Sequence, residues 1–399
     1  MPKLRFPGFE GEWHNDYIGN LSSYIKGASL SKADISENGT PFLLYGELYT
    51  TYKEVTRNIK RKTQRVVGEE YYSKVGDVVI PTSGETPEEI ATATCIMIPG
   101  VILAGDLNIF RTRNIDGRFF SYLINHKVNN EISRIAQGKS VVHIKGDEIS
   151  KILIKYPDSR EQTKILTFLE LLAARIDKQE RLIETLKKYK RGLLYDIFHH
   201  RKRFISSPVS EWSEAKLCEI CSYRRGSFPQ PYGLSEWYDE ENGMPFIQVA
   251  DVNDNMTVNL DTNRHISELA KKHSIFIPKG TLIVTLQGTL GRVAITSYDS
   301  YIDRTLLIIQ NLSNSVLKEF LMYAIYMKFA IEKQTADGSI IKTITKETLT
   351  DFVIQIPQIQ EQQKIVNILN YFEQKITKEE LRLQYLSCMK NGLMQQLFI

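Results

Sequence analysis

The chain has 399 residues, 42% of them hydrophobic and 25% charged, and a formal net charge of +4. This length predicts two or more domains, and so small a charge excess allows a polyanionic partner without requiring one. No apolar run approaches the ~20 residues that span a bilayer, the first residues lack the apolar stretch of a signal peptide, and the few scattered cysteines exclude a disulfide framework. We therefore expect a cytoplasmic protein.

The first globular unit is predicted at the start of the chain, and its pattern recurs. The stretch EWHNDYIGNLSSYIKG contains Trp13, and EWSEAKLCEICSYRRG contains Trp212, 199 residues later. Similar segments then follow in the same order in both copies. They are predicted strands at 74–80 and 278–284, further strands at 107–110 and 306–309, helices at 119–136 and 317–334, and glycine turns at Gly138 and Gly338. Short strands with a few helices predict an α+β fold for each copy.

Two stretches do not align between the copies, residues 40–70 and residues 228–275. Loops that differ on a repeated scaffold are the usual place for function. The pattern therefore predicts two related sites that read different things.

Two segments, 154–198 and 354–398, share one pattern at an offset of 200 residues without a gap. Each is predicted to be a single long helix whose apolar residues recur at spacings of four and three, as in a coiled coil. The seam residues are Ile165, Leu169, Leu172, Ile176, Ile183, Leu186, Leu193 and Ile197, then Ile365, Leu369, Phe372, Ile376, Leu383, Leu386, Leu393 and Leu397. Gln179 and Glu379 interrupt both seams at the same place, as do Lys190 and Lys390. Polar seam residues fix register and partner number, although an ordinary core helix remains the alternative.

The linker favours an antiparallel arrangement of the two helices. A helix of ~40 residues is about 60 Å long, whereas residues 199–212 span at most about 45 Å. We expect a pseudo-two-fold molecule with a domain at 1–155, a helix at 156–200, a second domain at 201–355 and a helix at 356–399. Two domains on a rigid spacer suit DNA, whose half-sites repeat along its axis.

Basic residues gather between Tyr52 and Arg65, beside several tyrosines. Cations interleaved with aromatics suit a DNA backbone and base edges, whereas a solvated loop is the alternative. The candidate DNA contacts in the first domain are Lys53, Arg57, Lys60, Arg61, Lys62 and Arg65, with Ser83 after a strand and Lys139 in the glycine turn. In the second domain they are Arg224, Arg225, Gln287, Arg292, Arg304 and Lys342, although each of these residue types, taken alone, is more often an ordinary surface residue.

The sequence contains no recognisable catalytic or metal-binding constellation. Cys218 and Cys221 have the spacing of half a zinc site, but no second pair completes it, and their alternation with apolar residues fits a core position. There is no phosphate-binding GxxxxGK[ST] loop, and the seven histidines fall in no triad or metal spacing.

The chain resembles the specificity subunits of type I restriction-modification systems. The resemblance rests on the opening LRFPGFEGEW, the paired P-x3-E-Q-x-K-I motifs at Pro157 and Pro357, the G-[KS]-x4-I turns, and the two heptad helices ending in K-x-G-L-[LM]. It implies two target-recognition domains that each read one half of a bipartite DNA site. It also implies helices that set the spacer and dock two methyltransferase subunits, and through them two restriction subunits, of a system that methylates adenine at N6. S-adenosylmethionine, ATP and magnesium would belong to those partners, and the chain itself would need no cofactor.

Two other classes of protein remain open on sequence grounds. An unfamiliar nuclease or methyltransferase would be active without partners. A coiled-coil adaptor would give its complex no preference for any DNA sequence.

Overall fold

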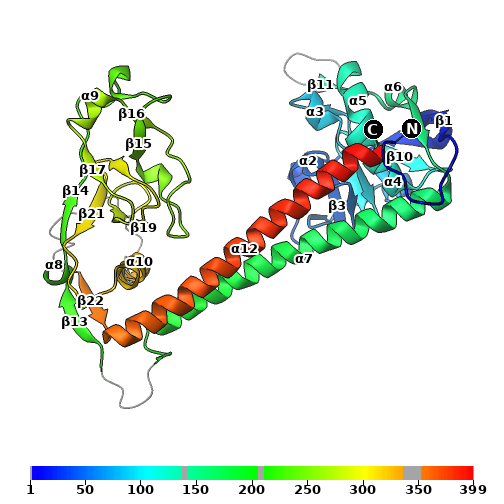
Figure 1. The fold of residues 1–399 in the computed structure, drawn as a ribbon. Coiled ribbons are helices and arrows are strands. Elements are labelled where there is room, and N and C mark those ends of the chain that lie inside the picture. Colours follow the sequence, from blue (N-terminus) through cyan, green and yellow to red (C-terminus); the bar gives the residue numbers. More distant parts are fainter. Residues whose placement is uncertain (1, 137–141, 205–210, 336–351, 399) are drawn as a thin grey trace. The chain divides into compact units, whose positions relative to one another are not determined.

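The computed structural model describes residues 2–136, 142–204, 211–335 and 352–398, and the chain divides into two compact units (Figure 1). Unit 1 comprises Met1–Arg181 and Leu381–Ile399, and unit 2 comprises Leu182–Glu380. Each unit therefore contains one half of each long helix. The glycine turns predicted at Gly138 and Gly338 lie outside the described residues.

Unit 1 is built around a five-stranded sheet of order β2-β10-β6-β8-β4. Its strands are β2 (Ser22–Lys26), β10 (Leu107–Thr112), β6 (Asp77–Pro81), β8 (Thr94–Ile96) and β4 (Val55–Thr56). A second sheet contains β5 (Lys62–Thr63), β3 (Thr40–Leu44) and β9 (Ile102–Ala104), while two strand pairs join β1 (His14–Tyr17) to β12 (Leu153–Tyr156) and β7 (Ser83–Gly84) to β11 (Val142–His143). All five residues of β6 are buried, as expected for a β-branched strand at the centre of a covered sheet.

The helices of unit 1 are short apart from the ends of the long pair. They are α1 (Ile18–Leu21), α2 (Glu47–Thr50), α3 (Pro87–Ile90), α4 (Gly117–Leu123), α5 (Asn129–Ile135) and α6 (Gly146–Ser150). A π-helical turn, Ile124–Val128, joins α4 to α5 where the sequence predicts one continuous helix. The Asn125 side chain donates to Ser121 O at 3.0 Å and to Ala93 O at 2.7 Å. The Asn125 amide therefore donates to a backbone carbonyl of its own helix, and the turn widens into a π-helical turn at this point.

Unit 2 repeats this architecture with one strand fewer in its main sheet. The main sheet contains β14 (Ser222–Arg225), β21 (Leu306–Gln310), β18 (Leu282–Thr285) and β19 (Val293–Ile295), in that order. The second sheet contains β16 (His265–Ile266), β15 (Met244–Ile247), β20 (Ser300–Ile302) and β17 (Ile275–Ile277), and β13 (Ser213–Lys216) pairs with β22 (Val353–Ile356). The helices are α8 (Leu217–Ile220), α9 (Glu268–Lys271) and α10 (Lys318–Thr335).

The strand registers confirm the sequence repeat. His14 pairs with Tyr156 in unit 1, and Ser213 pairs with Ile356 in unit 2. The sheet order β2-β10-β6-β8 corresponds to β14-β21-β18-β19, and the parallel pair β3 and β9 corresponds to β15 and β20. Within the described residues of unit 2, no strand corresponds to β4. The predicted α+β class is confirmed, and β4 is an addition to the first copy.

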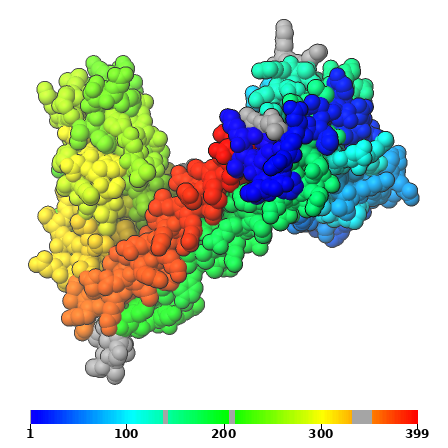
Figure 2. All heavy atoms as spheres, turned by 45° about the vertical axis from the view of Figure 1, so that its right-hand side comes forward, coloured from blue at the N-terminus to red at the C-terminus, as the bar shows by residue number. Residues whose placement is uncertain are grey.

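The two long helices are α7 (Ser159–Phe198) and α12 (Ile359–Phe398), and they pack antiparallel within each unit. In unit 2, Lys187 pairs with Glu380 and Lys190 pairs with Glu373. In unit 1, Leu169 of α7 shares a core with the last residues of α12, and the chain end lies against the first residues (Figures 1 and 2). All eight predicted seam residues of α7 are buried, and so are Gln179 and Lys190. The seam prediction is therefore confirmed for α7, where the polar interruptions are part of the packed face. In α12 the predicted seam residues divide equally between buried ones, Ile365, Leu369, Ile376 and Leu397, and half-buried ones, Phe372, Leu383, Leu386 and Leu393.

The repeated P-x3-E-Q motif joins each long helix to its unit. Gln162 accepts a hydrogen bond from Asp116 N at 2.9 Å and donates to Pro157 O at 2.8 Å. Gln362 makes the same pair of bonds, to Leu317 N at 2.8 Å and Pro357 O at 2.9 Å. Each glutamine thus links the start of a long helix to the start of α4 or α10, which gives the motif a structural role.

The glutamates of the same motif bind an arginine from the start of each unit. Arg5 donates to both Glu161 oxygens at 2.9 and 2.6 Å, and Arg203 donates to both Glu361 oxygens at 2.8 Å. Both carboxylates are buried, and bidentate arginine pairs of this kind are directional as well as strong. The sequence does carry a signal for this contact, because Arg-Phe occurs at 5–6 and again at 203–204, ahead of Trp13 and Trp212.

Candidate nucleic-acid interface

The basic segment of unit 1 runs from Tyr52 through β4 to β5. Its first part is held by β4, which pairs in parallel with β8. Its second part is held by Tyr52, whose hydroxyl accepts from Lys60 N at 3.2 Å, and by Phe42 N, which donates to Arg61 O at 2.9 Å. The segment is therefore a strand-bounded element with defined side-chain directions.

Four of the six predicted cations in this segment form ion pairs. Lys53 lies 3.7 Å from Asp177, and Arg57 lies 2.8 Å from Glu170. Arg61 pairs with the buried Glu47 at 2.8 Å, and Arg65 pairs with Asp34 at 2.9 Å. Lys60 and Lys62 are exposed, and neither has a carboxylate partner among the described residues. These two lysines are the cations of the segment that are most available to a polyanion.

The described predicted cations of unit 2 lie on β14 and in the connections before β19 and β21. Arg224 and Arg225 are exposed on β14, opposite Ile308 and Leu307 of β21. Arg304 is exposed, and its guanidinium lies 5.7 Å from the centre of the Tyr232 ring. Arg292 instead pairs with Asp254 at 2.5 Å and donates to Val252 O at 2.9 Å.

The remaining predicted residues divide into three cases. Ser83 is buried and donates to Asp106 at 2.7 Å, which gives its hydroxyl a structural partner. Gln287 is half-buried after β18. Lys139 and Lys342 lie outside the described residues.

Sequence reasoning missed a polar network beside Arg304. The Tyr232 hydroxyl donates to Asp303 Oδ2 at 2.7 Å and accepts from Gln248 Nε2 at 2.6 Å. Burial and the hydrogen bond to Asp303 raise the pKa of Tyr232. The available signal was the density of aromatic residues in the unaligned loop, namely Phe228, Tyr232, Trp237 and Tyr238. This network orders the loop next to an exposed arginine, where DNA contacts are predicted.

Glu54 is the half-buried acidic residue of the basic segment. Its side chain is 13% exposed, and it lies 2.9 Å from His126 Nε2 and 3.3 Å from Lys390 Nζ. Burial would raise the pKa of this carboxyl, but the hydrogen bond with His126 and the charge of Lys390 together hold the pKa at about 2. Glu54 is therefore ionised at neutral pH and ties the segment to α12.

The substitution Glu54→Gln should change how the unfolding free energy depends on pH. A carboxyl whose folded pKa is depressed contributes stability above its unfolded pKa and loses it as pH falls through the folded value. We expect the difference in unfolding free energy between the wild type and Glu54→Gln to be largest above about pH 5 and to shrink as pH falls towards about 2. Denaturant titrations of the full chain at stepped pH measure it, with the exposed Glu37→Gln as control. A difference that does not change with pH would contradict the assignment.

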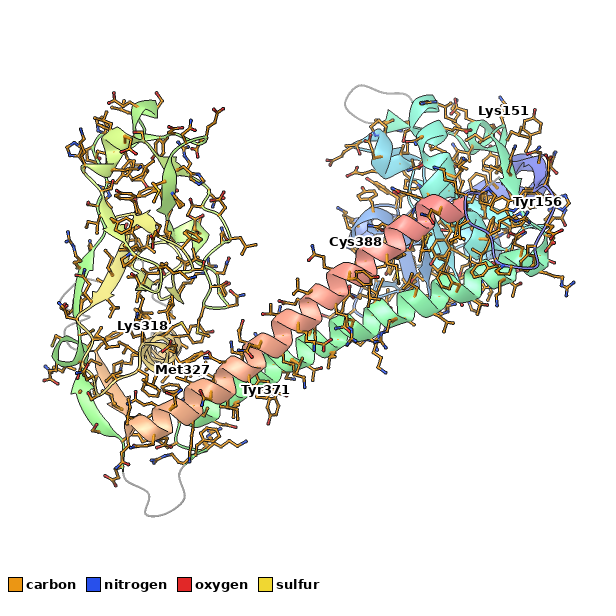
Figure 3. All side chains as sticks on the ribbon, in the orientation of Figure 1. Lys151, Tyr156, Lys318, Met327, Tyr371 and Cys388 are labelled. Atoms are coloured by element: carbon orange, nitrogen blue, oxygen red, sulfur yellow. The ribbon has the colours of Figure 1, made fainter. Side chains whose placement is uncertain are left out.

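The described residues contain no cluster of three or more potential metal ligands. Cys221 is buried in the core of unit 2 and Cys218 is exposed on α8, so the pair is divided between two environments. Among the same described residues, no helix is both long enough and apolar enough to cross a membrane. Figure 3 shows side chains such as Tyr371 and Cys388 projecting from α12, and both are exposed.

The comparisons with known proteins agree with the repeat. A family model described as "Type I restriction modification DNA specificity domain" matches residues 10–188 and again residues 209–385. These two matches cover most of the chain, and each begins in one copy of the repeat and ends within the following long helix.

Relatives and solved structures extend the similarity to almost the whole length. The type I restriction enzyme MjaVIII specificity subunit of Methanocaldococcus jannaschii is 23% identical over 409 residues, which cover 95% of this chain and 91% of the relative. The type I restriction-modification S subunit from M. genitalium has a TM-score of 0.59 at 17% identity and covers 100% of this chain and 99% of its own. A chain from a study of complex assembly and conformational transition of the type I R-M system has a TM-score of 0.61 at 18% identity and covers 98% of both chains. At these identities the two structures show a shared fold.

Proposed function

This chain belongs to the specificity subunits of type I restriction-modification systems, and from that premise we propose that each of its two units reads one half of a bipartite DNA site. The observation that carries the proposal is a scaffold that occurs twice with unlike loops. Two copies of one reading fold suit two half-sites, and different loops suit two different half-sequences. In this proposal residues 1–155 and 201–355 are the recognition domains, and residues 156–200 and 356–399 are the spacer helices.

The reading side chains are proposed from the exposed cations. Exposed cations lie in or beside the loops that differ between the copies. They are Lys60 and Lys62 in unit 1, and Arg224, Arg225 and Arg304 in unit 2. Lysine and arginine supply phosphate contacts, and arginine also reads guanine in the major groove. We keep Arg61, Arg65 and Arg292 as second candidates, because each must leave a carboxylate before it can bind a phosphate.

We propose the partners and cofactors by analogy with the family. The chain acts in a complex with two methyltransferase subunits, which carry two restriction subunits, and the site that it selects is methylated at adenine N6. S-adenosylmethionine, ATP and magnesium belong to those subunits, and the complex acts in the cytoplasm. Exposed apolar residues on α7 and α12, including Leu171, Tyr371, Leu381 and Tyr385, support a protein partner on the helices.

The direct test is methylation mapping by long-read sequencing of DNA from cells that carry the cognate methyltransferase subunit, with and without this chain. A two-part motif with a fixed unspecified gap, present only when the chain is present, is expected. Methylation by the purified chain alone would instead support an enzyme. A copurified methyltransferase subunit whose complex prefers no DNA sequence would support an adaptor.

Replacing both Lys60 and Lys62 with alanine should weaken DNA binding and flatten its salt dependence. Each lost phosphate contact lowers the slope of log K against log salt by about 0.9, so the double variant should lose about 1.8 from that slope. Titrations of the assembled complex at four salt concentrations measure it. Lys151→Ala, which removes one exposed lysine after α6 (Figure 3), is the control. An unchanged slope in the double variant would remove this pair from the interface.

A further inference from the structure

The one strand that distinguishes the main sheets of the two units is β4. Within the described residues the main sheet of unit 2 ends at β19, whereas that of unit 1 continues from β8 to β4. The backbone of this edge strand is anchored, because Cys95 N donates to Glu54 O at 2.8 Å and Ser121 Oγ donates to the same oxygen at 2.7 Å. Because β4 lies within the basic segment and the scaffold of unit 2 has no counterpart to it in the described residues, it calls for a role of its own.

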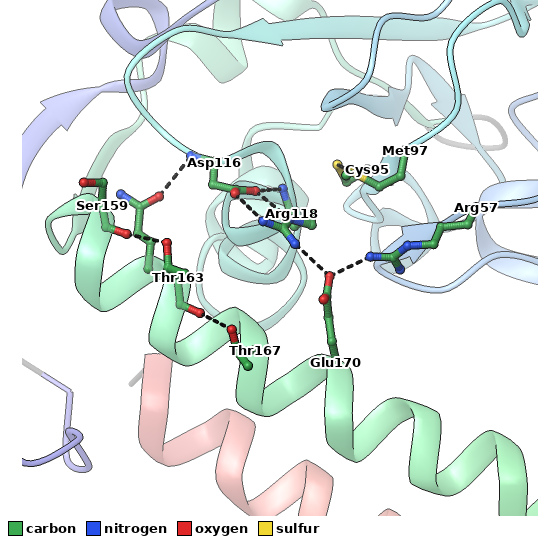
Figure 4. Close-up of polar contacts among 10 residues, drawn as sticks. Arg57, Cys95, Met97, Asp116, Arg118, Ser159, Thr163, Thr167 and Glu170 are labelled. Atoms are coloured by element: carbon green, nitrogen blue, oxygen red, sulfur yellow. Dashed lines mark hydrogen bonds and ion pairs between the residues drawn. The ribbon is translucent and has the colours of Figure 1, made fainter.

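The side chains around β4 reach both long helices. Lys53 lies 3.7 Å from Asp177 of α7, and Glu54 lies 3.3 Å from Lys390 of α12. Arg57 donates to Glu170 Oε1 of α7 at 2.8 Å (Figure 4). Five consecutive residues thus hold three ionic links to two helices.

The arginine link continues into the body of unit 1. The same Glu170 oxygen accepts from Arg118 Nη1 at 3.0 Å, and Arg118 binds Asp116, the N-cap of α4, at 2.7 Å (Figure 4). Burial would raise the pKa of Glu170, but the hydrogen bonds from Arg57 and Arg118 lower it. Glu170 is therefore ionised, and it binds both Arg118 at the start of α4 and Arg57 of the basic segment. A cavity of about 340 Å³ lies beside these residues, so apolar packing does not fill this junction.

Unit 2 uses the equivalent positions differently. Lys190 corresponds to Lys390, but it pairs with Glu373 of the facing helix and lies 5.9 Å from the Tyr323 ring. Position 370, which corresponds to Glu170, is an asparagine that accepts from the Tyr323 hydroxyl at 3.3 Å. These two positions of unit 2 thus link the long helices to each other and to α10.

Short chain connections carry the constraint from β4 to the exposed lysines. Thr56 Oγ1 donates to Asn58 O at 3.0 Å, and Ile59 is buried in the core. Lys60 then follows Arg57 by only three residues. The Arg57 link is therefore one of the anchors of the short segment that presents Lys60 and Lys62.

We propose that Glu54, Arg57 and Glu170 are positioning residues that hold the basic segment of unit 1 against α7 and α12. On this proposal Arg57 acts through Glu170 and not on a phosphate, and the base discrimination of one half-site depends on the three residues. The inference rests on the proposed function, because it assumes that residues 60–62 contact DNA. It gives the added strand β4 of unit 1 a role in the recognition of one half-site.

The test compares Arg57→Met with Glu170→Gln in the complex with its methyltransferase subunits. Methylation rates are measured on duplexes that carry the mapped site or one base change in either half. Both variants should lower discrimination at the same half-site about tenfold, a typical part of the energy of one mismatch, and leave the other half-site within about twofold. Arg57→Lys should retain most of the discrimination. Glu373→Gln, which breaks the corresponding helix contact in unit 2, is the matched control and should change neither half-site.

Glu170→Gln separates positioning from direct contact. If Arg57 bound phosphate, freeing it from Glu170 would leave discrimination intact, whereas Arg57→Met would weaken binding to every sequence and flatten the salt dependence. That pattern would overturn the proposal, as would two variants that behave like the wild type. Should Glu170→Gln unfold, Glu54→Gln breaks the other link and carries the same expectation. A wild-type complex without a bipartite preference would contradict the proposed function itself, so the two failures are distinguishable.

Discussion

Replacing Glu361 with alanine is expected to lower the unfolding free energy of unit 2 by about 3–5 kcal/mol, the range for breaking a buried ion pair. The carboxylate is fully buried and accepts from Arg203 Nε and Nη2, both at 2.8 Å, from Trp212 Nε1 at 3.2 Å and from Phe204 N at 3.3 Å. Removing it takes away the acceptor that these donors share. Burial would raise the pKa of Glu361, but its bond with Arg203 lowers it, so the charge persists at neutral pH.

The matching variant in unit 1 should cost less. Glu161 accepts from Arg5, but Trp13 Nε1 is buried without a partner in the described residues. We therefore expect Glu161→Ala to cost about 2–3 kcal/mol. Hydrogen exchange of the full chain in denaturant reports each unit separately, and Glu361→Gln, which keeps the shape but not the charge, should fall between wild type and alanine. Equal losses of unfolding free energy in Glu361→Ala and Glu161→Ala would contradict the argument that the larger number of donors to Glu361 makes its loss more costly.

Replacing Gly226 with alanine is expected to cost at least about 3 kcal/mol, in the range of steric strain at a fixed backbone position. A Cβ at this position would lie 2.3 Å from Asp303 O and 2.4 Å from Ile302 O. These are backbone atoms, and Gly226 N also donates to Leu306 O at 3.1 Å, so the strand contact must open. Because Gly226 directly follows Arg224 and Arg225, DNA binding should weaken as well.

Two other glycines provide the control for Gly226. Gly192 and Gly392 lie inside the long helices, and a Cβ at either position meets no atom within 4 Å. Alanine there should stabilise the chain by up to about 1 kcal/mol, because it removes the helix cost of glycine. In thermal and denaturant unfolding, Gly226→Ala should therefore lower the unfolding free energy, whereas Gly192→Ala and Gly392→Ala should raise it. Destabilisation by Gly192→Ala would instead indicate a contact that needs the bare backbone.

The helices and strands could be predicted because their signals are local and occur twice. The seam of α7 follows from its spacing, and β12 and β22 follow from apolar runs that end before Pro157 and Pro357. Tertiary partners have no such signal. Nothing near Arg57 in the sequence indicates that its partner is Glu170, which is 113 residues away. The basic segment was therefore recognisable as charged, but its division into paired and exposed cations was not.

The core of unit 1 is completed by side chains from the far end of the chain. Phe398 stacks on Tyr122 and His126, Met394 and Leu397 are buried beside them, and Leu4 N donates to Gln396 O at 3.0 Å. Glu54 meets Lys390 across 336 residues. At a synthesis rate of about 5–20 residues per second, Lys390 is added to the chain roughly 17 to 67 seconds after Glu54. During this interval the core of unit 1 lacks Met394, Leu397 and Phe398, so its packing can be completed only after the last helix has been made.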